Sequence, residues 1–516
     1  MSINLDALWP QITVAIGACA CLGFGVAGPR GAAAVPWLAG VALVAAATVE
    51  LVGLPGASPN GMVGMSAFVN PLVCGMGLLL VMLTSQARTT GGSKIDDPYV
   101  MPTETVPLML LSLVGVMLCA SAQDLVWLFL ALELTSLPTY VIVATSRRQR
   151  VAQEAGVKYF FLGALAAAVF LYGFAMLYGA TGATAFTEIR QVIASQIALG
   201  EVSPFVSCGL ALSILGICFK IAAVPMHAYV ADVYQGAAAP VTAMLAFVPK
   251  TAGFAALFAI VALTGAEPPA AIQCMVWITA VTTMTVGNVL GLVQKDVKRV
   301  LAYSSIAHSG YMLVGLIAAS SSPAASQPIH NGMAAVLFYL VGYGLATTVC
   351  FGVLGALRNS NDDEVTSYEG IAGLVSTQPR LAALMLVGTL SLLGFPLTVG
   401  FLGKIYLFGA AMSASHRWLV AIAVLNSAIA AVYYLRIAAA CYFGEQPTGQ
   451  ERRAVTCAPA TLAMTLAGLA SVALFLFAEP LANAAHRAAP PESLRQPVAA
   501  HEAEVRGEES SADAGH

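Results

Sequence analysis

The sequence predicts an all-α polytopic membrane protein with about 14 transmembrane helices. Of its 516 residues, 23 are Lys or Arg and 26 are Asp or Glu, so charged residues make up 9% of the chain. A soluble domain carries about 25%. Apolar residues make up 59%, and the mean hydropathy is +0.82. So few charges cannot cover a water-exposed surface of this size. The composition therefore excludes a soluble enzyme, a disordered chain and a nucleic-acid-binding protein.

Fourteen apolar segments have the length of a membrane-spanning helix, which is about 20 residues. They cover residues 6–27, 32–54, 66–86, 105–121, 123–145, 154–180, 203–226, 240–265, 270–292, 300–320, 330–357, 380–412, 416–443 and 458–480. The segment 380–412 is too long for one straight helix. The residues after the last apolar segment are mostly polar, and we expect residues 481–516 to form a disordered tail.

The basic residues of the predicted loops indicate how the chain is oriented. If the N-terminus lies outside, thirteen basic residues fall in inner loops, and only Arg190 and Arg417 fall in outer loops. Lys and Arg are enriched in cytoplasmic loops. We therefore expect both termini on the periplasmic side. The run 294–299 (QKDVKR) is expected to be a solvated inner loop.

Several ionisable residues fall inside the predicted spans, where a charge is costly and usually marks an ion or proton path. They are Glu50, Glu133, Lys158, Lys220, Lys250, Lys404 and Arg436. Lys158 has a structural alternative, because Glu154 lies one helical turn earlier. Glu50 and Arg436 lie near helix ends, where a long side chain can reach the interface. Structural explanations are weakest for Glu133, Lys220, Lys250 and Lys404.

Prolines accompany three of these charges. Glu133 and Lys220 are each followed by a proline five residues later, and Lys250 directly follows Pro249. Proline leaves the carbonyl four residues earlier without its helical hydrogen bond. Such a gap is tolerated in a membrane where other groups or water satisfy the carbonyl. We therefore expect hydrated polar pockets near the middle of the membrane.

The long segment 380–412 also carries a buried charge beside a helix break. Gly394 and Pro396 interrupt the helix, and Lys404 follows. A discontinuous helix with a buried charge is typical of ion-coupled transporters. Lys404 lies 184 residues after Lys220, and Arg436 lies 186 residues after Lys250. These similar offsets suggest a duplicated block of five helices, the second copy inverted in the membrane.

Two histidines are further candidates for proton transfer. His227 lies just beyond Pro225, and His308 lies one turn after Ser304 on the same helix face. Histidine can relay protons near neutral pH. A satisfied polar contact between helices is an equally good interpretation of either residue. The cysteines are scattered and form no pair with metal-site spacing, so no metal or cofactor site is predicted.

The segments that carry these residues also support a family resemblance. The chain resembles the antiporter-like membrane subunits of proton-pumping NADH:quinone oxidoreductase (respiratory complex I), most closely the subunit N branch. The resemblance covers residues 100–445 and rests on ALELTSLPTYV, FKIAAVPMHAYVADVY, TAMLAFVPK, KDVKRVLAYSSIAHSGYML and GFPLTVGFLGKIYLF. A lysine at position 404 departs from the glutamate that is usual in subunit M. The polar tail departs from the long lateral helix of subunit L.

The resemblance implies two inverted five-helix repeats in which helices 7 and 12 are broken. It divides the chain into a three-helix segment (1–104), a first repeat (105–265), a second repeat (270–443), a last helix (458–480) and the tail (481–516). By motif, Glu133 matches the family glutamate of the fifth helix. Lys220, Lys250 and Lys404 match the lysines of the first broken helix, the connecting helix and the second broken helix.

The resemblance further implies a subunit of a proton-translocating NADH:quinone reductase that has no redox centre of its own. FMN, iron–sulfur clusters and quinone are expected in partner subunits, and the partners are other membrane subunits and the lipid bilayer. Together with the Ala-rich composition, this favours a bacterial inner membrane. Two alternatives stay open. One is an Mrp-type cation/proton antiporter or membrane hydrogenase subunit, and the other is a structural scaffold.

Overall fold

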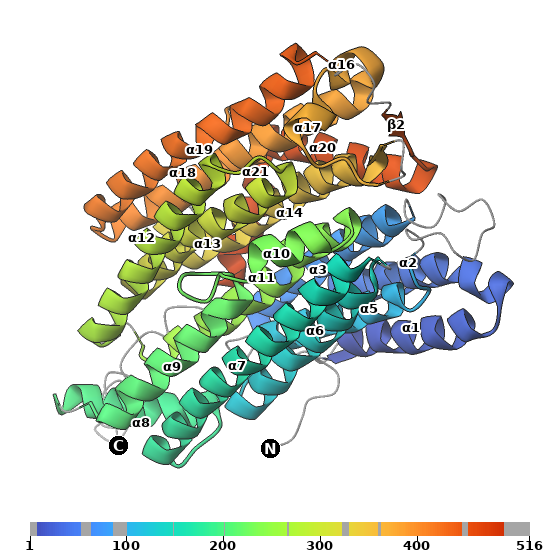
Figure 1. Ribbon diagram of the computed structural model, residues 1–516. Coiled ribbons are helices and arrows are strands. Elements are labelled where there is room, and N and C mark those ends of the chain that lie inside the picture. The colour runs from blue at the N-terminus through green and yellow to red at the C-terminus, as the bar shows by residue number, and fades with distance from the viewer. Residues whose placement is uncertain are drawn as a thin grey trace.

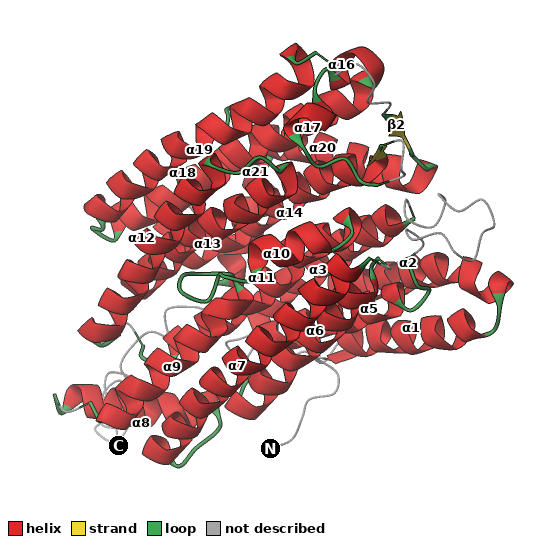
Figure 2. Ribbon diagram, in the orientation of Figure 1, coloured by secondary structure: helices red, strands yellow, loops and turns green. Residues whose placement is uncertain are grey.

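The computed structural model is almost entirely helical, which confirms the predicted fold class (Figure 1 and Figure 2). It describes residues 8–52, 63–85, 101–147, 149–200, 202–265, 268–321, 330–359, 363–445 and 452–489. The helices of the first half are α1 (Trp9–Val26), α2 (Pro29–Val52), α3 (Val63–Thr84), α5 (Thr105–Ala120), α6 (Leu125–Thr145), α7 (Arg150–Thr181), α8 (Phe186–Ala198), α9 (Pro204–Lys220), α10 (Val230–Gly236) and α11 (Ala239–Ala262).

The second half has the same character. Its helices are α12 (Ala270–Leu292), α13 (Val297–Ser321), α14 (Gly332–Ala356), α15 (Tyr368–Ile371), α16 (Leu374–Thr377), α17 (Pro379–Leu393), α18 (Val399–Ser413), α19 (Arg417–Phe443), α20 (Ala458–Leu476) and α21 (Ala478–Ala488). Two short strands, β1 (Leu357–Arg358) and β2 (Arg453–Ala454), pair antiparallel.

The fourteen predicted segments are all present in the described part of the chain. Eleven helices are long and apolar enough to cross a membrane, and α5 is a shorter apolar helix. The other two segments are broken, as α9–α10 and α17–α18. Counted along the chain they are the seventh and twelfth segments, which confirms the predicted positions of the breaks. The division of the chain into a three-helix segment and two repeats, with boundaries at residues 104, 265 and 443, stays a prediction.

Not every proline breaks its helix. Pro138 lies inside α6 and Pro249 inside α11, and both helices are continuous. The α9–α10 break contains Pro225, whereas α17 ends at Gly394 in the left-handed conformation. Proline bends a membrane helix without interrupting it when neighbouring groups satisfy the freed carbonyl. The lysines of the two broken helices therefore lie at real interruptions, whereas Lys250 does not.

The centre of the molecule is formed by α11, α13 and α14, which are almost completely buried. The peripheral helices carry large apolar side chains on their outer faces. Phe161 of α7, Trp418 of α19 and Leu425 of α19 are 66%, 82% and 64% exposed. Because apolar side chains favour lipid or another apolar surface over water, this distribution is that of a protein embedded in a membrane.

One end of the molecule, here called the basic end, includes α16 and β2 (Figure 1). Arg358 of β1, which pairs with β2, gathers there with Arg147 and Lys298 around Glu364, and Arg452 bonds the carbonyls of Gly370 and Ala372. Helix α8 lies at the opposite end and falls in a segment with no predicted span. It is amphipathic, with Glu188 in its first turn and Phe186, Ile189 and Ile193 buried. With 13 residues and a polar face it is too short for a span, which explains why the search for long apolar segments missed it.

Two expectations need correction. Helix α21 ends at Ala488, so the segment expected to be a disordered tail from residue 481 begins with a helix, packed through Ala482 and Ala485. The rest of that tail lies outside the described residues. The run 294–299 is not a fully solvated loop either, because the side chain of Lys298 is completely buried against Glu364. In both cases tertiary contacts supply partners that the local sequence does not reveal.

Candidate functional site

Lys220 is the last residue of α9, and its side chain points at α6. Its Nζ atom donates hydrogen bonds to Glu133 Oε1 at 3.1 Å and to Ser136 Oγ at 2.5 Å. The lysine side chain is 2% exposed and the glutamate side chain 19%. Taking both charges out of water is costly unless the geometry and the additional hydrogen bonds compensate. Ser136 provides such a bond, so Glu133 and Lys220 form a buried ion pair with an additional hydrogen bond.

The backbone at the α9–α10 break is satisfied by one side chain of the interrupted segment and by side chains of α12 and α13. Tyr229 Oη donates to Phe219 O at 2.8 Å, and Val224 N donates to Thr283 Oγ1 at 3.0 Å. Ser309 Oγ donates to Ile221 O, the carbonyl that Pro225 frees. An unsatisfied backbone group in a membrane costs several kcal/mol. The break beside Lys220 is therefore held open by α12 and α13 rather than by local sequence.

Lys250 lies in the middle of α11, where its ammonium group is surrounded by neutral acceptors. Its Nζ atom donates to Ser305 O at 2.6 Å, to Ser305 Oγ at 3.0 Å and to Ser309 Oγ at 2.6 Å. It also lies 5.1 Å from the ring centroid of Tyr343. No carboxylate of the described residues pairs with it. A small cavity lies between this lysine and Lys220, and both line it together with Tyr159, Tyr229 and Tyr234.

Lys404 lies in α18, just after the second helix break. Its Nζ atom donates to Leu393 O, the last carbonyl of α17, and to Ser427 Oγ, both at 2.7 Å. It lies 5.0 Å from the ring centroid of Tyr311. A lysine near a helix C-terminus is favoured by the partial negative charge of the last carbonyls. The break thus creates the binding position for the ammonium group.

His308 connects the environments of Lys250 and Lys404. Its Nδ1 atom lies 2.6 Å from Tyr339 Oη and its Nε2 atom 2.8 Å from Tyr434 Oη. The ring centroids of Tyr343, which faces Lys250, and of Tyr311, which faces Lys404, lie 5.1 Å and 5.9 Å from the imidazole. Its predicted neighbour Ser304 is joined to it indirectly, since that hydroxyl also bonds Tyr434. His308 and the small cavity together therefore connect the polar groups around Lys220, Lys250 and Lys404 into one series, which we call the buried polar line.

Lys158 and His227 do not join this line in the described residues. Lys158 pairs with Glu154 at 2.8 Å, as the structural alternative anticipated, and with Asp232 at 3.0 Å. Its side chain is 44% exposed. His227 lies in the segment between α9 and α10, and its buried Nδ1 atom has no hydrogen-bond partner among the described residues. The participation of both residues in proton transfer stays a prediction.

Several polar residues of the line were not singled out from the sequence. They are Ser136, Ser305, Ser309, Tyr339, Tyr343 and Tyr434. A signal for some of them was available, because Ser305 and Ser309 share one helix face, as do Tyr339 and Tyr343. Pairs of polar residues spaced by four within an apolar helix indicate a polar stripe. Which lysine the stripe serves depends on the packing of α11 against α13.

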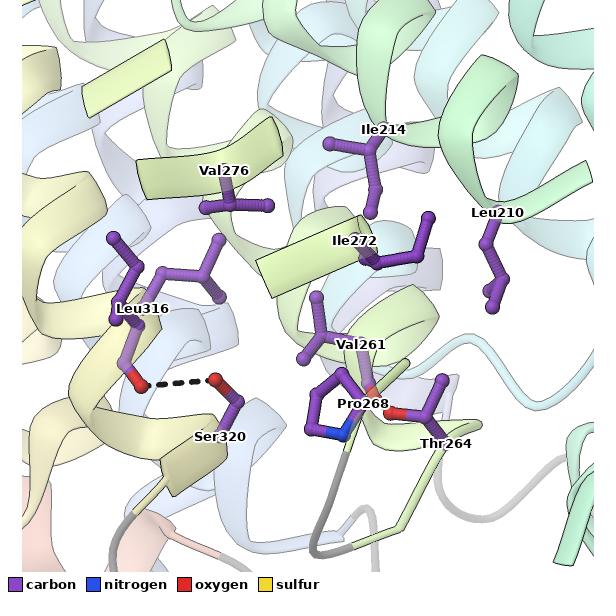
Figure 3. Close-up of a pocket in the computed structure, with 10 residues that line it drawn as sticks. Leu210, Ile214, Val261, Thr264, Pro268, Ile272, Val276, Leu316 and Ser320 are labelled. Atoms are coloured by element: carbon purple, nitrogen blue, oxygen red, sulfur yellow. Dashed lines mark hydrogen bonds between the residues drawn. The ribbon is translucent and has the colours of Figure 1, made fainter. Parts of the chain in front are cut away.

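No cluster of His, Cys, Asp or Glu side chains in the described residues has the composition of a metal site. A separate pocket, shown in Figure 3, is lined mainly by apolar side chains such as Ile214, Val276 and Leu316. Its two polar members, Thr264 and Ser320, each bond a carbonyl three residues earlier in the chain. None of the three lysines lines this pocket. No ionisable side chain of the described residues lines the pocket, so we assign it no part in proton transfer.

The fold and the buried charges define a class of protein: a multi-pass subunit with antiporter-like architecture. Comparison with known proteins gives the family. Residues 122–430 match the model of the family described as NADH:quinone oxidoreductase/Mrp antiporter, transmembrane. This match covers more than half of the chain, which therefore belongs to that family.

Individual relatives agree with this assignment. The NADH-quinone oxidoreductase subunit N of Bdellovibrio bacteriovorus is 38% identical over 411 residues, which cover 78% of this chain and 81% of the relative. A chain of respiratory complex I from Thermus thermophilus superposes with a TM-score of 0.74 at 31% identity, covering 92% and 98% of the two chains. A chain of the Mrp complex from a Dietzia species has a TM-score of 0.76 at 21% identity, covering 96% and 98%, and shares the fold.

Proposed function

We propose that this chain is the proton-translocating subunit N of a bacterial NADH:quinone oxidoreductase. It moves protons across the membrane and is driven by electron transfer from NADH to quinone in other subunits. The observation that carries the proposal is the line of buried polar groups from Glu133 and Lys220, through Lys250 and His308, to Lys404. The subunit N relatives and the complex I chain support the choice of host complex.

Each charged residue of the line has a distinct part in the proposed cycle. Glu133 holds a proton on Lys220, because an opposite charge favours the charged lysine, and separating the pair favours release. Lys250 passes the proton between hydroxyl groups that can both donate and accept. His308 and its tyrosines bridge to Lys404. Lys158 and His227 are secondary members that act at the edge of this path.

The energy required is within reach of such rearrangements. Moving one charge against a potential of 100 mV costs about 2.3 kcal/mol. An ion pair at 4 Å and an effective dielectric constant of 20 is worth about 4 kcal/mol. Separating a buried pair such as Lys220 and Glu133 therefore changes the free energy by an amount comparable to the work of one transfer step.

The same proposal places the chain in the bacterial inner membrane with both termini on the periplasmic side. The basic end then faces the cytoplasm, in agreement with the enrichment of Lys and Arg in cytoplasmic loops. The exposed apolar faces of α7 and α19 contact lipid or neighbouring membrane subunits. FMN, iron–sulfur clusters and quinone belong to partner subunits, and this chain contributes proton transfer alone.

Lys220→Met and Glu133→Gln test the proposal in membrane vesicles that contain the assembled complex. Both variants should lower the number of protons moved per NADH oxidised by at least twofold, because each removes one charge of the pair. Tyr172→Phe is a suitable control, since Tyr172 lies on the outer face of α7 with 62% of its surface exposed. A normal proton yield in both charge variants would contradict the proposed path.

The fold similarity to an Mrp complex favours one other function, that of a cation/proton antiporter subunit. A membrane hydrogenase subunit belongs to the same alternative. A native gel of mildly solubilised membranes, stained for NADH oxidation and probed for this chain, separates these cases. Migration with a large NADH-oxidising complex supports the proposal. Migration with a smaller complex that does not oxidise NADH, together with sodium-dependent proton flux, supports the alternative.

A further inference from the structure

A buried carboxylate joins several helices at the basic end, away from the polar line. Glu364 lies between α14 and α15, and its side chain is 1% exposed. It pairs with Arg147, which follows α6, with Lys298 of α13 at 3.1 Å and with Arg358 of β1 at 3.7 Å. We call these four residues the Glu364 cluster. One carboxylate therefore contacts cations from three separate elements.

The Glu364 cluster also holds the segment that connects α10 to α11. Glu364 Oε1 accepts a hydrogen bond from Ala239 N at 3.0 Å, and Lys298 Nζ donates to Ala237 O at 2.6 Å. Between them, Ala238 N donates to Ser146 Oγ at 3.3 Å. Three successive residues are thus bonded to groups outside the segment. The start of α11 is fixed relative to α6 and α13.

The fixed helix is the one that carries Lys250. That lysine lies eleven residues after Ala239, or about 16 Å along the helix, and Ser305 lies seven residues after Lys298, or about 10 Å along α13. Helices α11 and α13 are therefore joined at two levels. The Glu364 cluster joins them at the basic end, and the bonds from Lys250 to Ser305 and Ser309 join them deeper in the molecule.

We propose that Glu364 is a positioning residue for proton transfer, which aligns Lys250 with Ser305 and Ser309 by fixing the start of α11 against α13. The inference rests on the proposed function. Neutralising the carboxylate leaves three cations close together in a buried site, where like charges repel strongly. Removing one partner of a buried ion pair leaves the others uncompensated. The ends of α6, α11 and α13 then separate, and Lys250 loses its alignment.

Glu364→Gln and Glu364→Asp test this inference in the assembled complex. Glu364→Gln keeps the size of the side chain and removes its charge, so the proton yield per NADH should fall at least twofold. NADH oxidation by a water-soluble artificial acceptor should stay normal. Glu364→Asp keeps the charge and should retain more than half of the wild-type yield. Glu369→Gln is the matched control, because Glu369 lies five residues away on the surface and its removal should change nothing.

The proton yield is compared at equal amounts of assembled complex, measured on a native gel. An unchanged yield in Glu364→Gln would overturn the inference. The inference would also be overturned if the lower proton yields of Glu364→Gln and Glu364→Asp were explained entirely by a smaller amount of assembled complex. If Glu364→Gln does not assemble, Lys298→Met decides. That variant keeps both guanidinium partners, and it should lower the yield because it frees Ala237 O.

The two proposals fail in different ways. If Lys220→Met and Glu133→Gln both pump normally, the proposed proton path is wrong. If these two variants lose pumping while Glu364→Gln pumps normally, the proposed function stands and only the positioning by Glu364 is rejected.

Discussion

The three buried lysines differ in what surrounds their ammonium groups. Lys220 has a carboxylate partner in Glu133. Among the described residues, Lys250 and Lys404 contact hydroxyl and carbonyl oxygens and an aromatic ring instead. A tyrosine ring near a desolvated ammonium group contributes about 2 kcal/mol or somewhat more. A full counter-charge at short distance contributes more. We therefore expect the charged form to be held most firmly at Lys220, and the other two sites to exchange a proton more readily.

The position of Lys404 depends on one glycine. Gly394 has φ +78°, and a Cβ atom there would lie 2.9 Å from Lys404 Cδ. An alanine in the left-handed conformation costs about 1–2 kcal/mol, and the added methyl group also displaces the lysine. We expect Gly394→Ala to lower the thermal unfolding temperature of the complex and to reduce the proton yield.

Gly179→Ala is the control for this prediction. A Cβ atom at Gly179 in α7 would contact nothing within 4 Å, so this helical glycine should accept alanine without loss. Equal behaviour of the two variants would show that Gly394 has no special importance for Lys404.

At the scale of the element, the broken helices show how a membrane protein accommodates an interruption. The carbonyls and amides freed between α9 and α10 are bonded by Tyr229, Thr283 and Ser309, which come from the interrupted segment itself, α12 and α13. The break is therefore a feature of the packed structure and would not persist in the isolated helix.

Tyr229→Phe removes one of these bonds and leaves the carbonyl of Phe219 without this partner. That carbonyl keeps its hydrogen bond from Ala222 N at 3.0 Å, so the loss is that of one intramolecular hydrogen bond, about 0.5–1.5 kcal/mol. We expect the variant to unfold at a lower temperature and to pump less efficiently, because Lys220 directly follows Phe219. Thermal unfolding of the purified complex and proton uptake by vesicles measure the two effects.

Tyr140→Phe makes the same chemical change at a buried tyrosine whose hydroxyl has no hydrogen-bond partner among the described residues. Removing that hydroxyl should leave stability unchanged or raise it. A similar loss in both variants would mean that the bond of Tyr229 contributes nothing to the break.

At the scale of the whole molecule, the basic end is fixed by charge rather than by apolar packing alone. Burial raises the pKa of Glu364, but the charges of Arg147, Lys298 and Arg358 outweigh it and lower the pKa to about 2. A carboxyl whose pKa is lower in the folded state contributes stability above its unfolded pKa. That contribution is lost as the pH falls through the folded value. The affected window lies between about pH 4.5 and 2.

We therefore expect the wild-type complex to lose stability as the pH falls through this window, and Glu364→Gln to lack this component. Thermal unfolding of the detergent-purified complex between pH 7 and pH 3 measures the difference. The variant should be less stable at pH 7, and the difference in unfolding temperature between wild type and variant should become smaller as the pH falls. A constant difference across the range would contradict the ionised state of Glu364 in the folded protein.

The sequence was sufficient to predict the fold class, the fourteen apolar segments and the charges Glu133, Lys220, Lys250 and Lys404 inside them. These follow from local physical rules, since a span needs a long apolar segment and a charge within it stands out. The two broken helices needed more than this pattern, because Pro249 lies beside Lys250 in the continuous helix α11, and only the family resemblance singled out the seventh and twelfth segments.

Only the tertiary structure decided which groups face each charge. It joined Lys250 to the hydroxyls of α13, separated Lys158 from the polar line, and buried Lys298 and Glu364 in one cluster. Helices α8 and α21 also escaped prediction, because short helices are stabilised by packing more than by their own composition. Hydrogen-bond partners and ion pairs form between residues far apart in the chain, and the packing of helices sets their distances. Local pattern therefore identified the charges, and the fold determined what they can do.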